Sequence, residues 1–437
     1  MNTIDLYRSK KKTPKEAVEL VPKKGIISMG MRAATPPALL KALEERARSG
    51  GIEDLKVYYM RCGPVALETI FQEDLMDVIH PFSTMLTRGE VELANKGFKK
   101  GKKYLQFVPM SFSYYPKMLS ELIGIDTFLF TVTPMDDFGY FNFSIHGDYA
   151  IETARFAKKV IVEVNENMPR TAGDSLLHVS EVDAIVEHTC PLIEDPQRPG
   201  DELDKKIGNT IVDMIPDRAT IQIGIGGVPN AVCEALKNHK DLGLHTEVLT
   251  SGTLDLIQSG TITNRYKNLH RNQNVFTFAA GDKKLYDAVH KNPSMGCYPV
   301  SHVNNPSVIA QNDNVISVNS FIEIDFSGQV NAEFMHHQFS GVGGQLDFMR
   351  GARASKGGKA ILASHSTAKK GTISKITPRL QSVATDTRLD VDYVVTEYGS
   401  CRLMGLSSTE RTLALISLAH PKFRDELTKQ AKEMHFI

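Results

Sequence analysis

Short apolar runs alternate with amphipathic segments along most of the chain, and this alternation predicts an α/β fold with largely parallel sheets. The run KKGIISMGM predicts a strand that ends at Gly30. Thr35 is then placed to cap a helix that opens at Pro36, runs through PPALLKALEERARS and ends at Gly50. Because LKVYYMRCG predicts the next strand, these segments together indicate a βαβ unit.

The same order of elements recurs near the middle of the chain. TIQIGIGG, at 220–227, predicts a strand that enters a glycine turn, and Pro229 is placed to open the helix PNAVCEALKNHK. GLHTEVLTSG then predicts the following strand. The repeated order indicates an internal duplication and therefore two similar domains.

Length, prolines and charge limit the organisation and the partners. A chain of 437 residues is long enough for two domains, and the proline-interrupted stretch CPLIEDPQRPGDELDKKIG predicts a boundary between domains at 1–195 and 200–437. Lys plus Arg equals Asp plus Glu at 51 each, so no global charge attracts nucleic acid or a membrane surface.

Cysteine usage and the N-terminal residues favour a cytoplasmic protein. The 5 cysteines are scattered and show no spacing typical of zinc ligands, which predicts a reducing compartment and no metal site. The N-terminal sequence has no apolar signal-like segment, and no apolar run reaches the roughly 18 residues of a membrane span.

A carboxylate in the middle of a predicted strand is the first candidate for chemistry. His245, Thr246 and Glu247 stand in a row where a buried parallel strand normally carries valine or isoleucine. In a right-handed βαβ unit the ligand crevice lies beyond the carboxyl ends of the strands, which is where Glu247 would be. A glutamate on a solvated strand face is the alternative interpretation.

The glycine turn beside it predicts an anion site. Gly224, Gly226 and Gly227 let the backbone approach a ligand, and the helix that follows points its positive N-terminus at the same crevice, so phosphate or pyrophosphate is the expected ligand. A nicotinamide dinucleotide is the rival ligand. The expected GxGxxG pattern is broken, however, because Pro229 stands where the last glycine should be.

A second glycine cluster and a lysine pair extend the candidate site. FSGVGGQLDFMRGA places Gly341, Gly343 and Gly344 in one loop, which could aim backbone N–H groups at an oxyanion or could be a plain turn. HSTAKKGTISKITP offers Lys369 and Lys370 for phosphate or carbonyl contacts, although solvated lysines are common. With no Ser/His/Asp arrangement legible, the residues favour a carboxylate nucleophile flanked by two glycine loops.

Several long motifs carry a family resemblance in the family's own order. They are EVNENMPRTAGDSLLHVSEVDAIVE, IQIGIGGVPNAV, LGLHTEVLTSGTLDLIQSG, NSFIEIDFSGQVNAE, FSGVGGQLDFMRGA and DVDYVVTEYG. The chain resembles the acetyl-CoA hydrolase/transferase family, in the branch of 4-hydroxybutyrate CoA-transferase and butyryl-CoA:acetate CoA-transferase. The resemblance implies two CoA-transferase-type α/β domains, an active site at the domain interface, a homodimer, coenzyme A as substrate and a ping-pong mechanism.

The resemblance also implies roles for individual residues. Glu247 would be the nucleophile, in the position of the glutamate of the family's H-[ST]-E motif, and Gly344 would take part in catalysis. Asn304 and Glu397 fall where the family has polar active-site residues. The residues implied to bind coenzyme A are Gly224, Ile225, Gly226, Gly227, Val228, Ser340 and Lys369.

Departures from the family pattern bear on the acyl substrate. The first βαβ copy carries Met31 and Arg32 after its first strand and Arg61 after its second, at the predicted crevice edge of the N-terminal domain. An arginine there could bind a second carboxylate bidentately, which adds itaconate or succinate to butyrate or acetate as possible substrates. Arginines on ordinary surface loops are the alternative.

The sequence therefore predicts an acyl-CoA:carboxylate CoA-transferase that works through an acyl-glutamyl anhydride and a glutamyl-CoA thioester. A carboxylate is ionised at neutral pH and needs no base to attack a thioester. An acyl-CoA hydrolase is the near alternative, since water could intercept the acyl-enzyme. A non-catalytic acyl-CoA-binding protein is the alternative from another class, and a nicotinamide oxidoreductase is the weakest.

Overall fold

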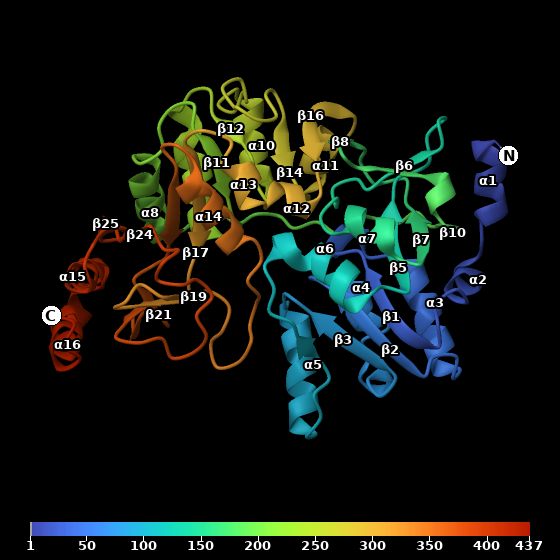
Figure 1. The fold of residues 1–437 in the computed structure, drawn as a ribbon, viewed down its shortest axis with the longest axis horizontal. Coiled ribbons are helices and arrows are strands. Elements are labelled where there is room, and N and C mark those ends of the chain that lie inside the picture. Colours follow the sequence, from blue (N-terminus) through green and yellow to red (C-terminus); the bar gives the residue numbers. More distant parts are fainter. Residues whose placement is uncertain (1) are drawn as a thin grey trace. The chain divides into compact units, whose positions relative to one another are not determined.

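The computed structural model describes residues 2–437 and divides them into two compact units (Figure 1). The first unit contains residues up to 195 together with 277–279 and 286–302, and the second contains the remainder. Both units are α/β with mostly parallel sheets, which confirms the predicted fold class. Among the described residues no helix combines the length and apolarity needed to cross a membrane.

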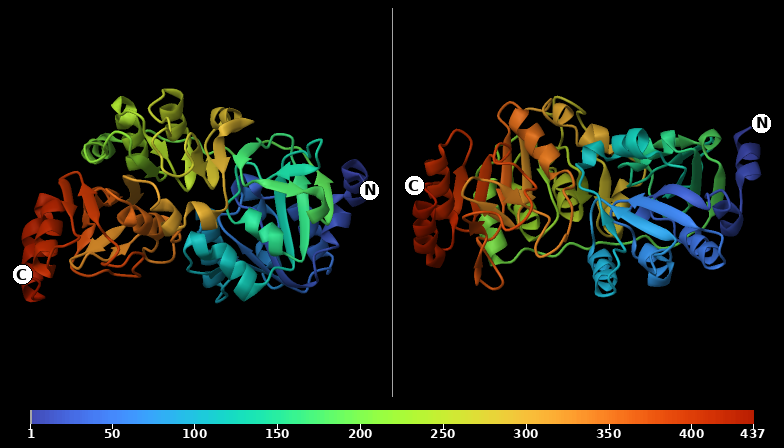
Figure 2. Two further views of the ribbon diagram at one scale, coloured as in Figure 1. Left: turned by 45° about the horizontal axis from the view of Figure 1, so that its top comes forward. Right: turned by 60° about the horizontal axis from the view of Figure 1, so that its bottom comes forward.

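The first unit is built on a seven-stranded parallel sheet in the order β10-β7-β5-β1-β2-β3-β4. Figure 2 gives two further views of its blue and cyan strands. The strands are β1 (Lys24–Met29), β2 (Asp54–Tyr59), β3 (Ile79–Ser83), β4 (Gln106–Phe107), β5 (Thr127–Val132), β7 (Lys159–Val164) and β10 (Ala184–Glu187). The main helices of the unit are α1 (Thr3–Lys10), α2 (Pro14–Val18), α3 (Pro37–Arg48), α4 (Pro64–Glu68), α5 (Arg88–Lys99), α6 (Tyr115–Lys117) and α7 (Ala150–Phe156).

Smaller elements complete this unit. The strands β6 (Tyr140–Asn142) and β9 (Leu176–His178) pair antiparallel, and β8 (Thr171–Gly173) pairs with β16 (Asn292–Cys297). The short 3₁₀ helices are η1 (Arg32–Ala34), η2 (Glu73–Leu75), η3 (Phe112–Tyr114) and η5 (Val179–Glu181), and η4 (Met118–Ile123) is a π-helix. The segment that alternates between the units forms β14 (Asn274–Phe276), β15 (Phe278–Ala280), α11 (Lys283–Val289) and α12 (Val300–Val303).

The second unit repeats the strand order of the first. Its main sheet runs β12-β11-β17-β20-β24-β25, with only β25 antiparallel. Across the sheet, the strands β12-β11-β17-β20-β24 correspond one to one to β2-β1-β5-β7-β10 of the first unit, as a duplication would produce. These strands are β11 (Thr220–Ile223), β12 (Gly243–Leu244), β17 (Val315–Ser320), β20 (Lys359–Ala363), β24 (Tyr393–Thr396) and β25 (Gly399–Arg402).

Along the chain, the helices of the second unit precede, separate and follow the strands of this sheet, and several short strands also occur between them. The helices are α8 (Glu202–Val212), α9 (Gly227–Ala235), η6 (Leu236–Asn238), α10 (Ser251–Gln258), α13 (Pro306–Ile309), α14 (Gln345–Ala354), α15 (Ser408–Leu418) and α16 (Pro421–Glu433). The short strands are β13 (Val248–Thr250), β18 (Glu323–Asp325), β19 (Val330–Asn331), β21 (Thr367–Ala368), β22 (Ile373–Ser374) and β23 (Ile376–Thr377).

Helix α3 shows why the predicted elements form and where their predicted ends were wrong. Its leucines are buried and its last turn carries two arginines, as an amphipathic helix with a favourable dipole requires. Thr35 does not cap it, because the helix begins at Pro37. The Thr35 hydroxyl instead donates to the Gly30 carbonyl at 2.9 Å and accepts the Gly63 N–H at 2.9 Å, which joins the ends of β1 and β2.

Candidate active site

The predicted strand that carries Glu247 is interrupted at residues 245–247. Two short strands, β12 and β13, stand on either side of it, so the prediction of one continuous strand was wrong. The main chain of the triplet is still hydrogen-bonded to two neighbouring strands. The His245 N–H donates to the Ile221 carbonyl at 3.2 Å, and the Thr246 N–H donates to the Val275 carbonyl at 2.9 Å. This break leaves the Glu247 side chain half-buried between two buried strands.

Asn304 and Gly344 meet the Glu247 carboxylate. The Asn304 amide donates from Nδ2 to Oε2 of Glu247 at 2.7 Å. A Cβ added to Gly344 would overlap both that oxygen and that nitrogen, so only a glycine admits this approach. Gly344 is also the N-cap residue of α14, which directs the positive end of that helix toward the carboxylate.

His245 braces the segments that bring these two groups together. Its side chain is fully buried, and its Nε2–H donates to the main-chain carbonyl of Val303 at 2.8 Å, next to Asn304 in the chain. The His245 and Phe348 rings pack edge to face, with their centroids 6.2 Å apart. The Phe348 N–H in turn donates to the Gly344 carbonyl at 3.0 Å. These contacts give His245 the role of a structural brace.

The glycine turn from 224 to 227 follows β11 at the carboxyl edge of the second sheet. Gly226 has a φ of 136°, a conformation that side chains other than glycine rarely adopt, and Ile225 is exposed at the tip of the turn. Helix α9 begins at Gly227, so the prediction that Pro229 opens it was wrong by two residues. Val228, in the first turn of α9, is buried.

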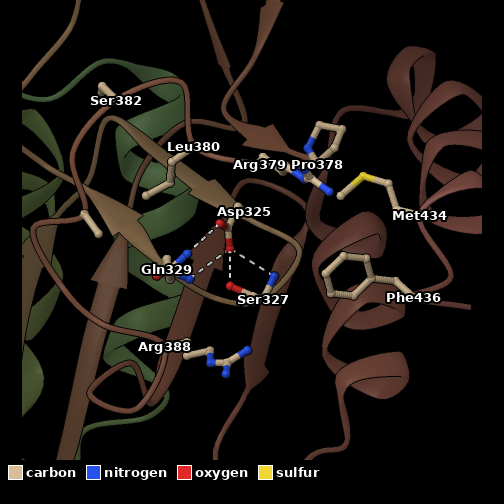
Figure 3. Close-up of a pocket in the computed structure, with 11 residues that line it drawn as sticks. Asp325, Ser327, Gln329, Pro378, Arg379, Leu380, Ser382, Arg388, Met434 and Phe436 are labelled. Carbon is tan, nitrogen blue, oxygen red and sulfur yellow. Dashed lines mark hydrogen bonds between the residues drawn. The ribbon is translucent and has the colours of Figure 1, made fainter.

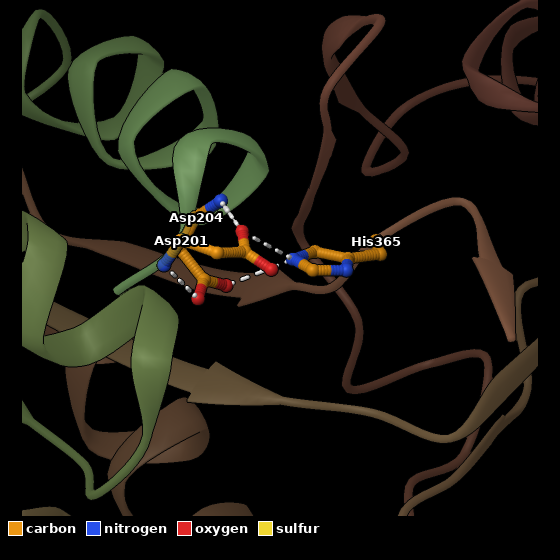
Figure 4. Close-up of side chains that lie close together, drawn as sticks. All are labelled: Asp201, Asp204 and His365. Atoms are coloured by element: carbon orange, nitrogen blue, oxygen red, sulfur yellow. Dashed lines mark hydrogen bonds and ion pairs between the residues drawn. The ribbon is translucent and has the colours of Figure 1, made fainter. Parts of the chain in front are cut away.

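A carboxylate from α8 lies directly behind this turn. A Cβ on Gly227 would overlap the carboxylate of Asp204, which also pairs with Nε2 of His365 at 2.8 Å (Figure 4). Asp201 completes a trio whose ligand atoms lie within 4.8 Å of one another, near enough in principle to hold a metal ion. Asp201 and Asp204 already accept each other's N–H groups in a capping box, so helix capping and the ion pair account for the trio.

Lys369 and Glu397 belong to one hairpin region of the second unit. Lys369 is exposed in the turn between β21 and β22, with a left-handed φ of 47°. Glu397 is buried, and its carboxylate accepts the N–H of Ser366 at 2.8 Å and its hydroxyl at 2.6 Å. Glu397 therefore fixes the start of the hairpin that presents Lys369.

Some residues of these loops were missed by sequence reasoning. Ser366 and Asp204 were not singled out, although serine in the HSTAK segment and aspartate at a helix start were visible signals. Lys375 was missed as well: its Nζ donates to the Ser364 hydroxyl at 2.6 Å, and burial lowers its pKa. Ser340 donates its N–H to the Glu333 carbonyl at 3.1 Å, in the loop that leads to Gly344.

The acyl-pocket candidates from the first βαβ copy lie together in the first unit. Met31 is fully buried, and the main-chain N–H of Arg32 donates to the Arg61 carbonyl at 3.1 Å. Both arginines have left-handed backbone, with φ of 49° and 45°. Arg32 is nearly buried and forms an ion pair with Asp195 at 2.7 Å, so a carboxylate already lies on its guanidinium.

Each unit holds at least one pocket that is lined by its own residues alone. In the first unit a pocket of about 280 Å³ is lined by Arg32 and by residues at the ends of neighbouring strands. In the second unit a pocket of about 450 Å³ adjoins β18 and the C-terminal segment (Figure 3). The Asp325 carboxylate in that pocket is bonded within its own turn, to Ser327 and Gln329, and no predicted site residue lines it.

The comparisons with known proteins agree on the family. The model of the acetyl-CoA hydrolase/transferase N-terminal domain matches residues 1–194, and that of the C-terminal domain matches 281–431. The chain is 48% identical over 332 residues to 4-hydroxybutyrate coenzyme A transferase of Clostridium kluyveri, covering 75% of this chain and 77% of that protein. It is 39% identical over 440 residues to butyryl-CoA:acetate CoA-transferase of Anaerostipes caccae, covering 98% and 97%.

Solved structures agree over the full length. RipA from Yersinia pestis is 48% identical, covers 100% of both chains and superposes with a TM-score of 0.95. The 4-hydroxybutyrate CoA-transferase from Porphyromonas gingivalis is 35% identical, covers 99% of both chains and has a TM-score of 0.84. The chain therefore belongs to the acetyl-CoA hydrolase/transferase family, and its relatives from Clostridium kluyveri, Anaerostipes caccae and Porphyromonas gingivalis named above are CoA-transferases.

Proposed function

We propose that this protein is an acyl-CoA:carboxylate CoA-transferase that acts on short-chain acyl-CoA, with Glu247 as the nucleophile. The observation that carries the proposal is the environment of one carboxylate. Asn304 donates to Oε2 of Glu247, and Gly344 leaves room beside the same oxygen. Such a carboxylate is held in place before substrate arrives, which lowers the entropic cost of its attack.

The reaction proceeds by two exchanges at the Glu247 carboxyl group. The carboxylate attacks the thioester carbonyl, the C–S bond breaks, and CoA leaves as a thiolate while an acyl-glutamyl anhydride forms. The thiolate then attacks the glutamyl carbonyl and releases the acyl group as a free carboxylate. The resulting glutamyl-CoA thioester reacts with a second carboxylate by the same steps in reverse.

Each tetrahedral intermediate carries an oxyanion, which needs hydrogen-bond donors. We assign this role to the Gly344 backbone N–H at the start of α14, with Asn304 orienting the glutamate. One well-placed donor of this kind is worth roughly 2.7–4 kcal/mol in the transition state. We assign coenzyme A to the turn from Gly224 to Val228, to Ser340 and to Lys369, since glycine backbone and a lysine suit its phosphates.

The substrates are proposed from chemistry and from the relatives. 4-Hydroxybutyryl-CoA or butyryl-CoA with acetate is the first choice, and itaconate or succinate is the second because arginines lie in the first unit.

A homodimer and a cytoplasmic location stay predictions. Light scattering of the purified protein tests the first of these, and cell fractionation tests the second.

The decisive experiment is to trap the enzyme-bound thioester. The protein is incubated with butyryl-CoA without an acceptor, treated with borohydride and mapped by peptide mass spectrometry. The label is expected on Glu247 alone, and Glu247→Gln should abolish both the label and transfer. Glu323→Gln is the matched control and should keep both. A label on another glutamate, or full turnover by Glu247→Gln, overturns the assignment.

A further inference from the structure

The two segments to which we assign coenzyme A come from strands that are not neighbours. The turn from Gly224 to Val228 follows β11, and the hairpin that presents Lys369 follows β20. In the sheet, β17 lies between these two strands. Because neighbouring strands are about 4.8 Å apart, the ends of β11 and β20 are separated by roughly 10 Å. A direct connection between the two segments therefore needs side chains.

Helix α8 supplies the side chain that connects them. The carboxylate of Asp204 pairs with Nε2 of His365 at 2.8 Å, and His365 stands four residues before Lys369 in the chain. A Cβ added to Gly227 would overlap the same carboxylate, so the carboxylate packs directly against the main chain of the glycine turn. Figure 4 shows the imidazole of His365 directed at the first turn of α8. One carboxylate thus meets both segments.

The aspartate end of this connection is held firmly. Asp201 and Asp204 cap α8 by accepting each other's main-chain N–H groups, each at 2.9 Å. Helix α8 packs closely on α9, the helix that begins in the glycine turn, since a Cβ added to Gly208 would lie 3.1 Å from atoms of Ala231. A shift of α8 would therefore displace α9 and the turn with it.

The histidine end is fixed by its two neighbours in the chain. The N–H and the hydroxyl of Ser366 both donate to the Glu397 carboxylate, at 2.8 Å and 2.6 Å. The Ser364 hydroxyl accepts from Nζ of Lys375 at 2.6 Å. Burial lowers the pKa of the Lys375 ammonium, and the carboxylates of Glu397 and Asp204 oppose that effect. Polar contacts on both sides of the histidine therefore fix the start of the hairpin.

We propose that Asp204 and His365 are positioning residues for coenzyme A, because their hydrogen bond sets the separation between the glycine turn and the Lys369 hairpin. The inference rests on the proposed function, which assigns coenzyme A to these two segments. A contact between firmly held partners keeps both segments in the binding arrangement before coenzyme A arrives. Such preorganisation lowers the entropic cost of binding, and neither side chain needs to touch the ligand.

The binding test compares two amide substitutions of His365. The amide of glutamine reaches about as far as Nε2 of histidine and can donate to Asp204, whereas the shorter asparagine does not reach. Coenzyme A binding to the full-length variants is measured by calorimetry. His365→Asn should weaken binding at least about fivefold, and His365→Gln should stay within about twofold of the parent protein. His80→Asn is the matched control, since His80 pairs with Asp54 at 3.3 Å in the first unit, and it should not change binding.

The kinetic test separates positioning from a general disturbance of the site. Butyryl-CoA and butyryl-pantetheine carry the same thioester, but only butyryl-CoA has the phosphates that the glycine turn and Lys369 would bind. His365→Asn should raise KM for butyryl-CoA at least about fivefold, with a smaller change in kcat, and should leave KM for butyryl-pantetheine within about twofold. Equal increases in KM for the two donors would overturn the positioning role.

The positioning role and the proposed function fail separately. If the trapped thioester maps away from Glu247 while His365→Asn weakens coenzyme A binding and His365→Gln does not, only the nucleophile is wrong. If the thioester maps to Glu247 and both His365 variants bind coenzyme A as the parent protein does, only the positioning role is wrong. Equal loss of coenzyme A affinity in the two variants also overturns it, because the glutamine retains the donor.

Discussion

Gly344 is the residue whose side-chain size should decide turnover. Its φ of −100° is open to any residue, so the backbone itself does not demand glycine. A Cβ there would overlap the Glu247 carboxylate and the Asn304 amide. Gly344→Val is therefore expected to lower kcat by at least about 10²-fold, as loss of an oxyanion donor does, with a much smaller change in melting temperature.

Gly89→Ala is the matched control for this substitution. Gly89 lies in α5, where a Cβ meets only the end of the flexible Leu67 side chain. Its kcat should stay within twofold of the parent protein. A Gly344→Val protein with near-normal kcat would show that the 341–344 loop is only a turn.

His245 should affect turnover through the segment that carries Asn304. His245→Leu removes the donor to the Val303 carbonyl, which should cost about 1–3 kcal/mol of stability and lower kcat about tenfold or more, with little change in KM for acyl-CoA. His245→Gln keeps a donor and should recover part of kcat. His239→Leu is the control. His239 makes the same kind of hydrogen bond, from Nε2 to the Ile215 carbonyl at 2.9 Å, but that carbonyl does not belong to the segment that carries Asn304. Equal losses of kcat in both leucine variants would contradict the bracing role.

At the scale of the element, pattern alone located the strands and helices of the two βαβ units but not the breaks in them. The apolar runs predicted β1, β2 and β11, because burial on both faces of a parallel sheet demands such runs. The interruption between β12 and β13 depends on partners elsewhere in the chain, and Asn304 lies 57 positions from Glu247. Sequence motifs identified the nucleophile candidate, whereas the contacts to its carboxylate needed the folded chain.

Lys267 gives the β12 region a pH-dependent stability. Its Nζ donates to the carbonyls of Leu244, in β12, and Gln273, each at 2.8 Å, and burial lowers its pKa to about 7. An unfolded lysine has a pKa near ~10.4, so between pH 7 and 10 the unfolded chain binds more protons than the folded one. This group therefore makes folding more favourable as pH rises through that window.

Lys267→Met removes the titrating group. The stability of the variant relative to the parent protein should fall as pH rises from 7 to 10, by up to about 1.4 kcal/mol per pH unit. Chemical denaturation at pH 7, 8.5 and 10 measures the difference. Lys283→Met, at an exposed position of α11, should show no such trend, and a parallel pH dependence in both variants would mean that Lys267 stays charged in the folded protein.

At the scale of the whole molecule, two sheets that share the order of five strands carry different chemistry. The second copy holds the candidate nucleophile, whereas the equivalent strand ends of the first copy hold Arg32 and Arg61. If the two copies divided these roles after duplication, the copy with the arginines is the one that selects the carboxylate acceptor. Succinate should then exceed butyrate in kcat/KM as the acceptor, because a second carboxylate gains a charge-assisted hydrogen bond from an arginine.

Arg32→Met and Arg61→Met, assayed separately, identify the arginine responsible. The arginine that contacts the second carboxylate of the acceptor is expected to be the one whose methionine variant reverses the acceptor order, while the other variant keeps that order. New CoA thioesters are quantified by mass spectrometry with one acyl-CoA donor and matched mono- and dicarboxylates, and free thiol is measured in the same samples to separate transfer from hydrolysis. Equal kcat/KM for butyrate and succinate, unchanged in both variants, would place acceptor selection outside these two strand ends.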